Sequence, residues 1–250
     1  MKTTGNTILI TGGATGIGLA LAAAFLKAGN EVIICGRREQ RLREAQSQLP
    51  DVHITTCDVA DAAERRSLVE WTRANFGSLN ILINNAGIQR PLDFTNGAAE
   101  ALITGDDEID INLQAPIHLS ALFIPHLRAQ PAAAIVNITS ALGFIPSANV
   151  PVYCATKAAL HTFSWALRHQ LRDTSIKVFE VAPPAVDTDL QAASRPGKRS
   201  PSRGISAQIV AKAVLHALAK DHFETAIGQA RFLQWGARLA PQQLFKRVNA

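Results

Sequence analysis

The stretch from Thr7 to Gly18, Thr-Ile-Leu-Ile-Thr-Gly-Gly-Ala-Thr-Gly-Ile-Gly, decides the fold. Its first five residues are apolar or β-branched and predict a short buried parallel strand. The glycines predict a tight turn, and the apolar run from Leu19 to Ala28 predicts a helix that Gly29 ends. Strand, glycine turn and helix in this order place backbone amides and a helix N-terminus where a pyrophosphate binds.

Strands and helices continue to alternate along the chain. Further strands are expected at 31–35, 52–57, 79–83, 134–139, 176–181 and 224–228, and helices at 39–49, 62–75, 106 or 107 to 127, and 206–220. This alternation predicts an α/β fold, a doubly wound Rossmann-type parallel sheet of about seven strands with helices on both faces. We expect one domain spanning residues 1–250.

Composition excludes several classes of protein. With 250 residues and 47% hydrophobic residues the chain can bury a large core, and no run of apolar residues is long enough to span a membrane. The N-terminus enters a strand without a signal-peptide pattern, so we expect a soluble cytoplasmic protein. Three cysteines without metal-ligand spacing predict reduced thiols and no metal site. The net charge of +5 is spread along the chain with few aromatics, which argues against nucleic acid as a partner.

A second motif predicts chemistry. Ser140 follows the strand at 134–139, and the carboxyl ends of strands are where ligands bind in such sheets. Tyr153 and Lys157 follow at i and i+4, which places both side chains on one face of a helix. A nearby ammonium favours phenolate, so we expect Lys157 to lower the pKa of Tyr153 towards neutrality. Tyr-x-x-x-Lys alone is also compatible with an ordinary amphipathic helix.

Ser140, twelve intervening residues and then Tyr-x-x-x-Lys resemble the short-chain dehydrogenase/reductase family, as do Thr11-Gly-x-x-x-Gly-x-Gly18 and Asn84-Asn85-Ala86-Gly87. The resemblance implies that Tyr153 exchanges a proton with the substrate oxygen, that Ser140 positions this oxygen, and that Lys157 assists Tyr153 and holds the nicotinamide ribose. It also implies a nicotinamide dinucleotide contacted by the glycine motif at Gly12, Thr15, Gly16, Ile17 and Gly18.

The end of the second strand predicts the cofactor. Gly36 stands where NAD-dependent members of the family carry aspartate, and Arg37 and Arg38 follow. Arginine forks chelate a 2′-phosphate, so we expect NADP(H), with Arg37 as the main contact and NAD as the alternative. One alternative stays open, in which the arginines only cap or solvate the next helix. Thr15 also departs from the family members that carry a second basic residue just before Gly16, which argues against NADP(H).

By the same resemblance other positions contact the cofactor. These are Asp58, Val59, Asn85, Ala86, Gly87, Tyr153, Lys157, Pro183, Val186 and Thr188. Asp58 has an alternative role as a helix cap, although Asp61 is better placed for it. Pro184 stands where the family has glycine, which removes one backbone donor.

Asn112 matches the asparagine that completes the family's catalytic tetrad. Pro116 has no amide proton for the carbonyl of Asn112, so we expect a kink that frees this carbonyl. In the alternative interpretation the kink only shapes packing. Residues 189–204 read as a loop, and the family resemblance implies that it covers the substrate. Its basic residues, Arg195, Lys198, Arg199 and Arg203, recruit an anionic substrate or, in the alternative, are simply solvated.

These features together predict an oxidoreductase that transfers a hydride between NADP(H) and a carbonyl or secondary alcohol. The alternative is an NAD(P)-binding sensor without redox turnover. Family resemblance implies a homodimer or homotetramer, and the stretches at 85–90 and 182–188 resemble a bacterial subgroup named after the D-alanylation operon. The sequence does not identify the substrate.

Overall fold

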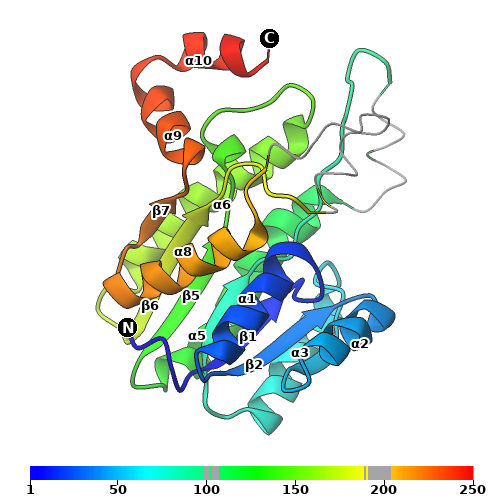
Figure 1. Cartoon of the computed structure of the whole chain (residues 1–250), viewed down its shortest axis with the longest axis vertical. Coiled ribbons are helices and arrows are strands. Elements are labelled where there is room, and N and C mark those ends of the chain that lie inside the picture. Colours follow the sequence, from blue (N-terminus) through cyan, green and yellow to red (C-terminus); the bar gives the residue numbers. More distant parts are fainter. Residues whose placement is uncertain (98–101, 103–106, 189, 191–203, 250) are drawn as a thin grey trace.

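The computed structural model describes residues 1–97, 102, 107–188, 190 and 204–249. Within these residues seven strands form one parallel sheet in the order β3-β2-β1-β4-β5-β6-β7 (Figure 1). The strands are β1 Thr7–Thr11, β2 Glu31–Gly36, β3 His53–Thr56, β4 Leu79–Asn84, β5 Ala133–Ile138, β6 Ile176–Ala182 and β7 Glu224–Ala226. The expected Rossmann-type fold is therefore confirmed.

Helices cover both faces of the sheet. One core cluster joins the sheet to α1 Gly16–Lys27, α2 Glu39–Gln48 and α8 Ala207–Lys220. A second cluster joins the opposite face to α3 Ala62–Asn75, α5 Ala115–Arg128 and α6 Pro151–Gln170. Successive side chains of a strand point to opposite faces, so Ile8 and Ile10 belong to the first cluster and Leu9 to the second.

The strand order reverses at β1, which pairs with β2 on one side and β4 on the other. The connections after β1 and β4 therefore leave in opposite directions, and a crevice opens between them at the carboxyl end of the sheet. This crevice is where the glycine turn, the residues after β4 and the residues after β5 meet.

Near Asn112, where the sequence predicted a kink, the backbone leaves the regular α-helical pattern. A π-helix, η1 Asp110–Gln114, leads into α5, and the N–H of Ala115 bonds the carbonyl of Asp110 five residues back. Pro116 has no N–H to continue the normal ladder, and the wider π-helical turn lies just before it. Asp107 is not helical, and the helical backbone begins at Glu108; Asp106, the other expected start, lies outside the described residues.

The C-terminal segment contains two helices that the sequence pattern did not predict. These are α9 Gln229–Leu239 and α10 Pro241–Val248, which lie beyond β7 at the carboxyl end of the sheet (Figure 1). A short 3₁₀ helix, η2 Ala141–Gly143, follows β5. Of the expected loop at 189–204, residues 189 and 191–203 lie outside the described residues, including all four of its basic side chains.

No helix in the described part of the chain combines the length and hydropathy needed to cross a membrane. The three cysteines, Cys35, Cys57 and Cys154, are buried free thiols.

Candidate active site

Two joined cavities lie at the carboxyl end of the sheet. Their volumes are about 530 Å³ and about 380 Å³, within the usual range for small-ligand sites. The two cavities adjoin, because both linings include Ile17, Asn85, Gly87, Gln89, Thr188 and Leu190. We name the larger the arginine-side cavity, after Arg37, Arg38 and Arg41, and the smaller the tyrosine-side cavity, after Tyr153.

The glycine turn between β1 and α1 forms one wall of the arginine-side cavity. Gly12 and Gly16 have φ values of +63° and +53°, which residues with a side chain rarely adopt. A Cβ on Gly12 would lie 2.9 Å from the Cα of Ala86, and a Cβ on Gly16 would lie 3.0 Å from Cγ2 of Thr188. Gly12, Thr15, Gly16 and Ile17 line the cavity, as expected for the motif.

Gly18 has a packing role behind this turn. A Cβ there would overlap the carbonyl oxygen of Gly12 and lie 2.7 Å from Nδ2 of Asn85. The missing side chain thus lets α1 approach the turn closely. Asn85 fixes the same place, since its Nδ2 donates to the carbonyls of Thr11 and Gly12 at 2.9 and 3.1 Å. Asn85, Ala86 and Gly87 all line the arginine-side cavity.

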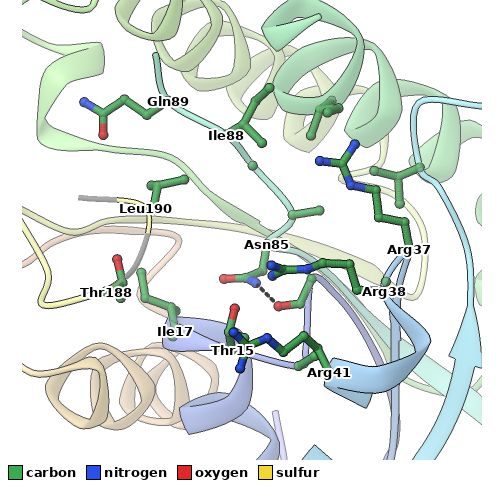
Figure 2. Close-up of a pocket in the computed structure, with 18 of the residues that line it drawn as sticks. Thr15, Ile17, Arg37, Arg38, Arg41, Asn85, Ile88, Gln89, Thr188 and Leu190 are labelled. Carbon is green, nitrogen blue, oxygen red and sulfur yellow. Dashed lines mark hydrogen bonds between the residues drawn. The ribbon is translucent and has the colours of Figure 1, made fainter. Parts of the chain in front are cut away.

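Three arginines line the far end of this cavity. Arg37 and Arg38 follow the end of β2, and Arg41 lies in the first turn of α2. Figure 2 shows Arg38 and Arg41 extending toward Thr15 and Asn85, whereas Arg37 points away from them. Sequence reasoning missed Arg41, although its three-residue spacing from Arg38 places both on one side of the helix start.

The loop after β3 completes this end of the cavity. Asp58 and Val59 line it, as expected. Asp61, not Asp58, caps α3, because its carboxylate accepts from the N–H groups of Ala63 and Glu64 at 2.7 and 2.8 Å. Asp58 bonds instead to the N–H of Ala60 at 3.0 Å, which leaves it beside the cavity.

The tyrosine-side cavity brings the catalytic candidates together. Ser140 lies at the end of β5, while Tyr153 and Lys157 lie one turn apart on α6, and all three line the cavity. Nζ of Lys157 lies 5.7 Å from the ring centroid of Tyr153 and donates to the carbonyl of Ile138 at 2.9 Å. Tyr153 and Lys157 are only 7% and 4% exposed, so both reacting groups are largely shielded from water.

The expected lowering of the Tyr153 pKa by Lys157 is wrong for this structure. Burial raises the pKa of Tyr153 to about 12, with a hydrogen bond from the Ser140 side chain pulling it the other way. Burial also lowers the pKa of Lys157 to about 8. Removing both groups from water disfavours the charged form of each, and this outweighs their proximity.

Asn112 lies behind both cavities and is fully buried. Its side-chain amide holds Ile88 from both sides: Oδ1 accepts from the Ile88 N–H and Nδ2 donates to the Ile88 carbonyl, each at 2.8 Å. A Cβ on Gly87 would lie 3.1 Å from Oδ1 of Asn112 and 3.7 Å from Nζ of Lys157. Asn112 therefore positions the strand-end backbone beside Lys157.

The segment after β6 forms another wall of the tyrosine-side cavity. Pro183, Pro184, Val186 and Thr188 all line it. The carbonyl of Pro183 accepts from the N–H of Ala141 at 2.9 Å, which joins this segment to the residues after Ser140. The expected contact residues Pro183, Val186 and Thr188 are thus at the cavity surface.

The C-terminal helices supply the outer wall of the tyrosine-side cavity, which sequence reasoning missed. Leu233 of α9 and Val248 of α10 line it, together with Leu142 and Val150. The side chain of Asn249 holds this wall in place, because its Oδ1 accepts from the N–H of Ala148 at 2.6 Å and its Nδ2 donates to the carbonyl of Pro146 at 3.1 Å. Among the described residues no cluster of His, Cys, Asp and Glu is arranged to hold a metal ion.

The sequence is similar to those of known proteins. The chain is 53% identical over 249 residues to "Uncharacterized oxidoreductase DltE" of Bacillus subtilis (strain 168), covering 100% of this chain and 98% of the relative. This match confirms the likeness to the subgroup named after the D-alanylation operon. An uncharacterized oxidoreductase of Staphylococcus aureus (strain USA300) is 31% identical over 217 residues, covering 86% of this chain and 91% of the relative.

Solved structures agree in fold. A short-chain dehydrogenase/reductase from Burkholderia phymatum in complex with NAD has a TM-score of 0.85 at 22% identity, covering 99% of this chain and 96% of that one. A short-chain dehydrogenase from Burkholderia cenocepacia J2315 in complex with NADP has a TM-score of 0.83 at 25% identity, covering all of both chains. The pattern of the short chain dehydrogenase family matches residues 6–199. The chain therefore belongs to the short-chain dehydrogenase/reductase family.

Proposed function

We propose that this protein is an oxidoreductase that transfers a hydride between NADP(H) and a carbonyl or secondary alcohol, with Tyr153 as the acid/base. One observation carries the proposal: Ser140, Tyr153 and Lys157 line a cavity that adjoins the cavity of the glycine turn and the three arginines. Relatives named oxidoreductases, and structural neighbours solved with NAD or NADP, support the same assignment.

The residues present fit a nicotinamide dinucleotide. The glycine turn is a cradle that side chains on Gly12 and Gly16 would fill, and α1 begins there with its N-terminal amides. Gly36 offers no carboxylate to repel a 2′-phosphate, while Arg37 and Arg38 supply cationic forks, with Arg41 beside them. We therefore assign NADP(H) as the preferred cofactor and NAD as the alternative.

Residues of the chain transfer the proton that accompanies the hydride. A bound nicotinamide supplies the hydride in reduction and accepts it in oxidation. Tyr153 donates its phenolic proton to the substrate oxygen in reduction and takes the hydroxyl proton in oxidation. Its raised pKa keeps the phenol protonated at neutral pH, which suits the reductive direction. Ser140 holds the reacting oxygen next to Tyr153, and Lys157 supplies positive charge beside the phenol.

The alternative is a protein that senses NAD(P) without turnover. Such a protein needs only the arginine-side cavity. Here Ser140, Tyr153 and Lys157 are all present, and all three face the same enclosed space. This convergence favours an enzyme over a sensor.

We also propose that the protein is a single cytoplasmic domain. Its substrate is a small molecule, and it binds neither nucleic acid nor a membrane. The chain associates as a homodimer or homotetramer by analogy with the family. Light scattering on the purified protein measures the assembly directly, and a monomer would contradict it.

A screen for turnover tests the proposed function. Purified protein is given NADPH and a panel of aldehydes and ketones, and oxidation of NADPH is followed by absorbance, with Tyr153→Phe as the matched control. We expect some carbonyls to be reduced by the wild type and not by the variant. Tight binding of NADPH with no turnover of any carbonyl or alcohol would instead support the sensor.

A further inference from the structure

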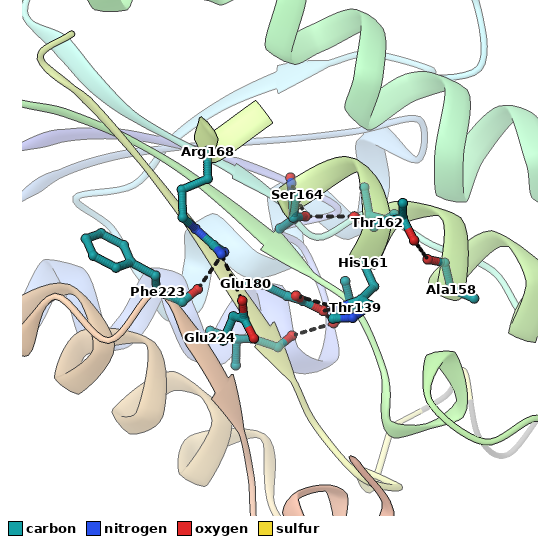
Figure 3. A network of polar contacts seen from close by, with 12 residues as sticks. Thr139, Ala158, His161, Thr162, Ser164, Arg168, Glu180, Phe223 and Glu224 are labelled. Atoms are coloured by element: carbon teal, nitrogen blue, oxygen red, sulfur yellow. Dashed lines mark hydrogen bonds and ion pairs between the residues drawn. The ribbon is translucent and has the colours of Figure 1, made fainter. Parts of the chain in front are cut away.

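A buried carboxylate lies between the two elements that carry the catalytic candidates. Glu180 of β6 is 2% exposed and accepts a hydrogen bond from Oγ1 of Thr139 at 2.7 Å. The same carboxylate contacts Nδ1 of His161 at 2.9 and 2.7 Å through its two oxygens (Figure 3). We name this set, Glu180 with Thr139 and His161, the Glu180 bridge.

The Glu180 bridge connects β6 to β5 and to α6. Thr139 directly precedes Ser140, and its N–H also bonds the carbonyl of Val181 at 2.9 Å. His161 lies on α6 one turn after Lys157. Glu180 therefore contacts β5 next to Ser140 and α6 next to Lys157, while neither Glu180 nor His161 is among the described residues that line the two cavities.

The rest of the environment leaves the bridge little freedom. The ring of His161 packs edge-on against Phe144 and at a tilt against Trp165, with centroid distances of 5.1 and 4.9 Å. A carboxylate without a proton only accepts hydrogen bonds, so its partner Nδ1 of His161 has to be the donor in that state. Burying such a group is costly, and well-packed apolar residues often give equal or better stability. Stability alone is therefore a weak reason for Glu180.

We propose that Glu180 and His161 are positioning residues for the proton transfer at Tyr153. The bridge fixes the end of β5 relative to α6 and so sets the place of Ser140 relative to Tyr153 and Lys157. Lys157 makes a parallel contact, since its Nζ bonds the carbonyl of Ile138. This inference rests on the proposed function, in which those three residues act on the substrate.

The chain contains a matched control for this claim. Arg168, also on α6, bonds Oε1 of Glu224 on β7 at 2.9 Å, and further donates to the carbonyls of Val178 and Phe223. Figure 3 shows this second ion pair beside the Glu180 bridge. It also joins α6 to the sheet, but it lies toward β7 instead of next to Ser140. Removing it therefore loosens α6 without touching the end of β5.

The test compares Glu180→Gln with Glu224→Gln. We expect Glu180→Gln to lower kcat about tenfold or more while the KM for NADPH stays within about twofold, because only positioning is lost. Without the bridge, Ser140 and Lys157 lie farther from the phenol and stabilise the phenolate less. Alcohol oxidation needs the phenolate as its base, so we expect the rise of kcat with pH for this reaction to shift to higher pH. Glu224→Gln keeps the wild-type kcat and pH profile, even at a similar loss of melting temperature.

Smaller changes keep the test valid if Glu180→Gln folds poorly. Thr139→Val removes the hydroxyl at constant shape, while Thr139→Ser retains it, so we expect loss of kcat only in the valine variant. In His161→Asn the amide nitrogen stands close to the position of Nδ1, and we expect partial activity. In His161→Leu no donor remains, and we expect the larger loss. Equal kcat across all of these variants overturns the proposal.

Hydrogen exchange separates this proposal from the proposed function, because it needs no substrate. We expect faster exchange in peptides covering residues 138–143 for Glu180→Gln and not for Glu224→Gln. Equal exchange in the two variants overturns the bridge. Faster exchange with an unchanged kcat overturns the positioning role and leaves the proposed function standing. Absence of any turnover by the wild type refutes the proposed function, and the positioning role with it, whatever the exchange shows.

Discussion

The end of β2 is the residue-scale feature that decides cofactor choice. Gly36 provides no side-chain oxygen there, and Arg37, Arg38 and Arg41 line the adjoining cavity. A ribose hydroxyl gains little from these cations, whereas a 2′-phosphate gains charge-assisted hydrogen bonds. We therefore expect the selectivity for NADP(H) over NAD(H) to depend on these three arginines and on the absence of a carboxylate at Gly36.

We expect Arg37→Ala and Arg38→Ala each to raise the KM for NADPH by about tenfold to a hundredfold, and to leave the KM for NADH within about twofold. Arg43→Ala is the control, because Arg43 pairs with Glu39 on the exposed face of α2. Steady-state kinetics with both cofactors provides the measurement. A wild-type preference for NADH would contradict the assignment.

The buried ammonium of Lys157 predicts a pH dependence. Burial lowers its pKa from 10.5 to about 8, so the charged form is present below this pH and is lost as pH rises through it. Tyr153, with a pKa raised to about 12, stays protonated over the same range. We expect kcat for carbonyl reduction to fall as pH rises through about 8.

Lys157→Arg is the control for this pH dependence, since a guanidinium stays charged throughout the range. In that variant the limb near pH 8 disappears, although the larger head group lowers kcat at every pH. A wild-type rate that is flat between about pH 6 and about pH 10 would show that the Lys157 charge does not govern the step.

At the scale of elements, the C-terminal helices form the boundary of the tyrosine-side cavity. Asn249 holds residues 146–148, which connect η2 with α6, through one accepted and one donated hydrogen bond. Leu233 and Val248 line the cavity from the same segment. The position of α9 and α10 thus controls the shape available to a substrate.

Asn249→Ala is expected to raise the KM for the carbonyl substrate about threefold to thirtyfold, since two hydrogen bonds at the cavity wall are lost. The KM for NADPH stays unchanged because Asn249 is remote from the arginine-side cavity. Asn75→Ala, which removes an exposed hydrogen bond to the carbonyl of Trp71 in the last turn of α3, serves as the control. An unchanged substrate KM would show that the wall opens freely without this contact.

Most of the sheet follows from local sequence. The buried β-branched run before the glycine turn predicts the position of β1. Asp61 predicts the start of α3, because a short acidic side chain can cap the first helical N–H groups. The helices α9 and α10 were missed because their large apolar residues do not pack into the core: Phe232, Trp235 and Leu239 are 64%, 59% and 81% exposed. The apolar residues of α9 and α10 are exposed, so their spacing does not reveal a helix face packed on the core.

The site was predicted less evenly, for physical reasons. Chain-local features, such as the spacing of Tyr153 and Lys157, identify residues that share one face. Burial depends on the whole fold, so the direction of the Tyr153 pKa shift was predicted wrongly from spacing alone. Glu180 escaped notice for the same reason, because only the register of β5 and β6 brings it beside Thr139 and His161.

At the scale of the whole molecule, one sheet supports both cavities, so the chain is expected to unfold as a unit. We expect a single thermal transition that NADPH raises by about 5 to 10 °C at roughly a hundred times its Kd. Differential scanning calorimetry measures both. Two separate transitions, with only one shifted by NADPH, would contradict the single-domain description.

The central claim also belongs to this scale: the two cavities act as one site, in which Tyr153 moves the proton while the nicotinamide is bound beside it. The most direct measurement is the kcat of Tyr153→Phe, and Tyr153 is the only tyrosine in the chain. We expect a loss of about a hundredfold or more, with the Kd for NADPH unchanged within about twofold. Carbonyl reduction by Tyr153→Phe at more than about a tenth of the wild-type rate would contradict the account.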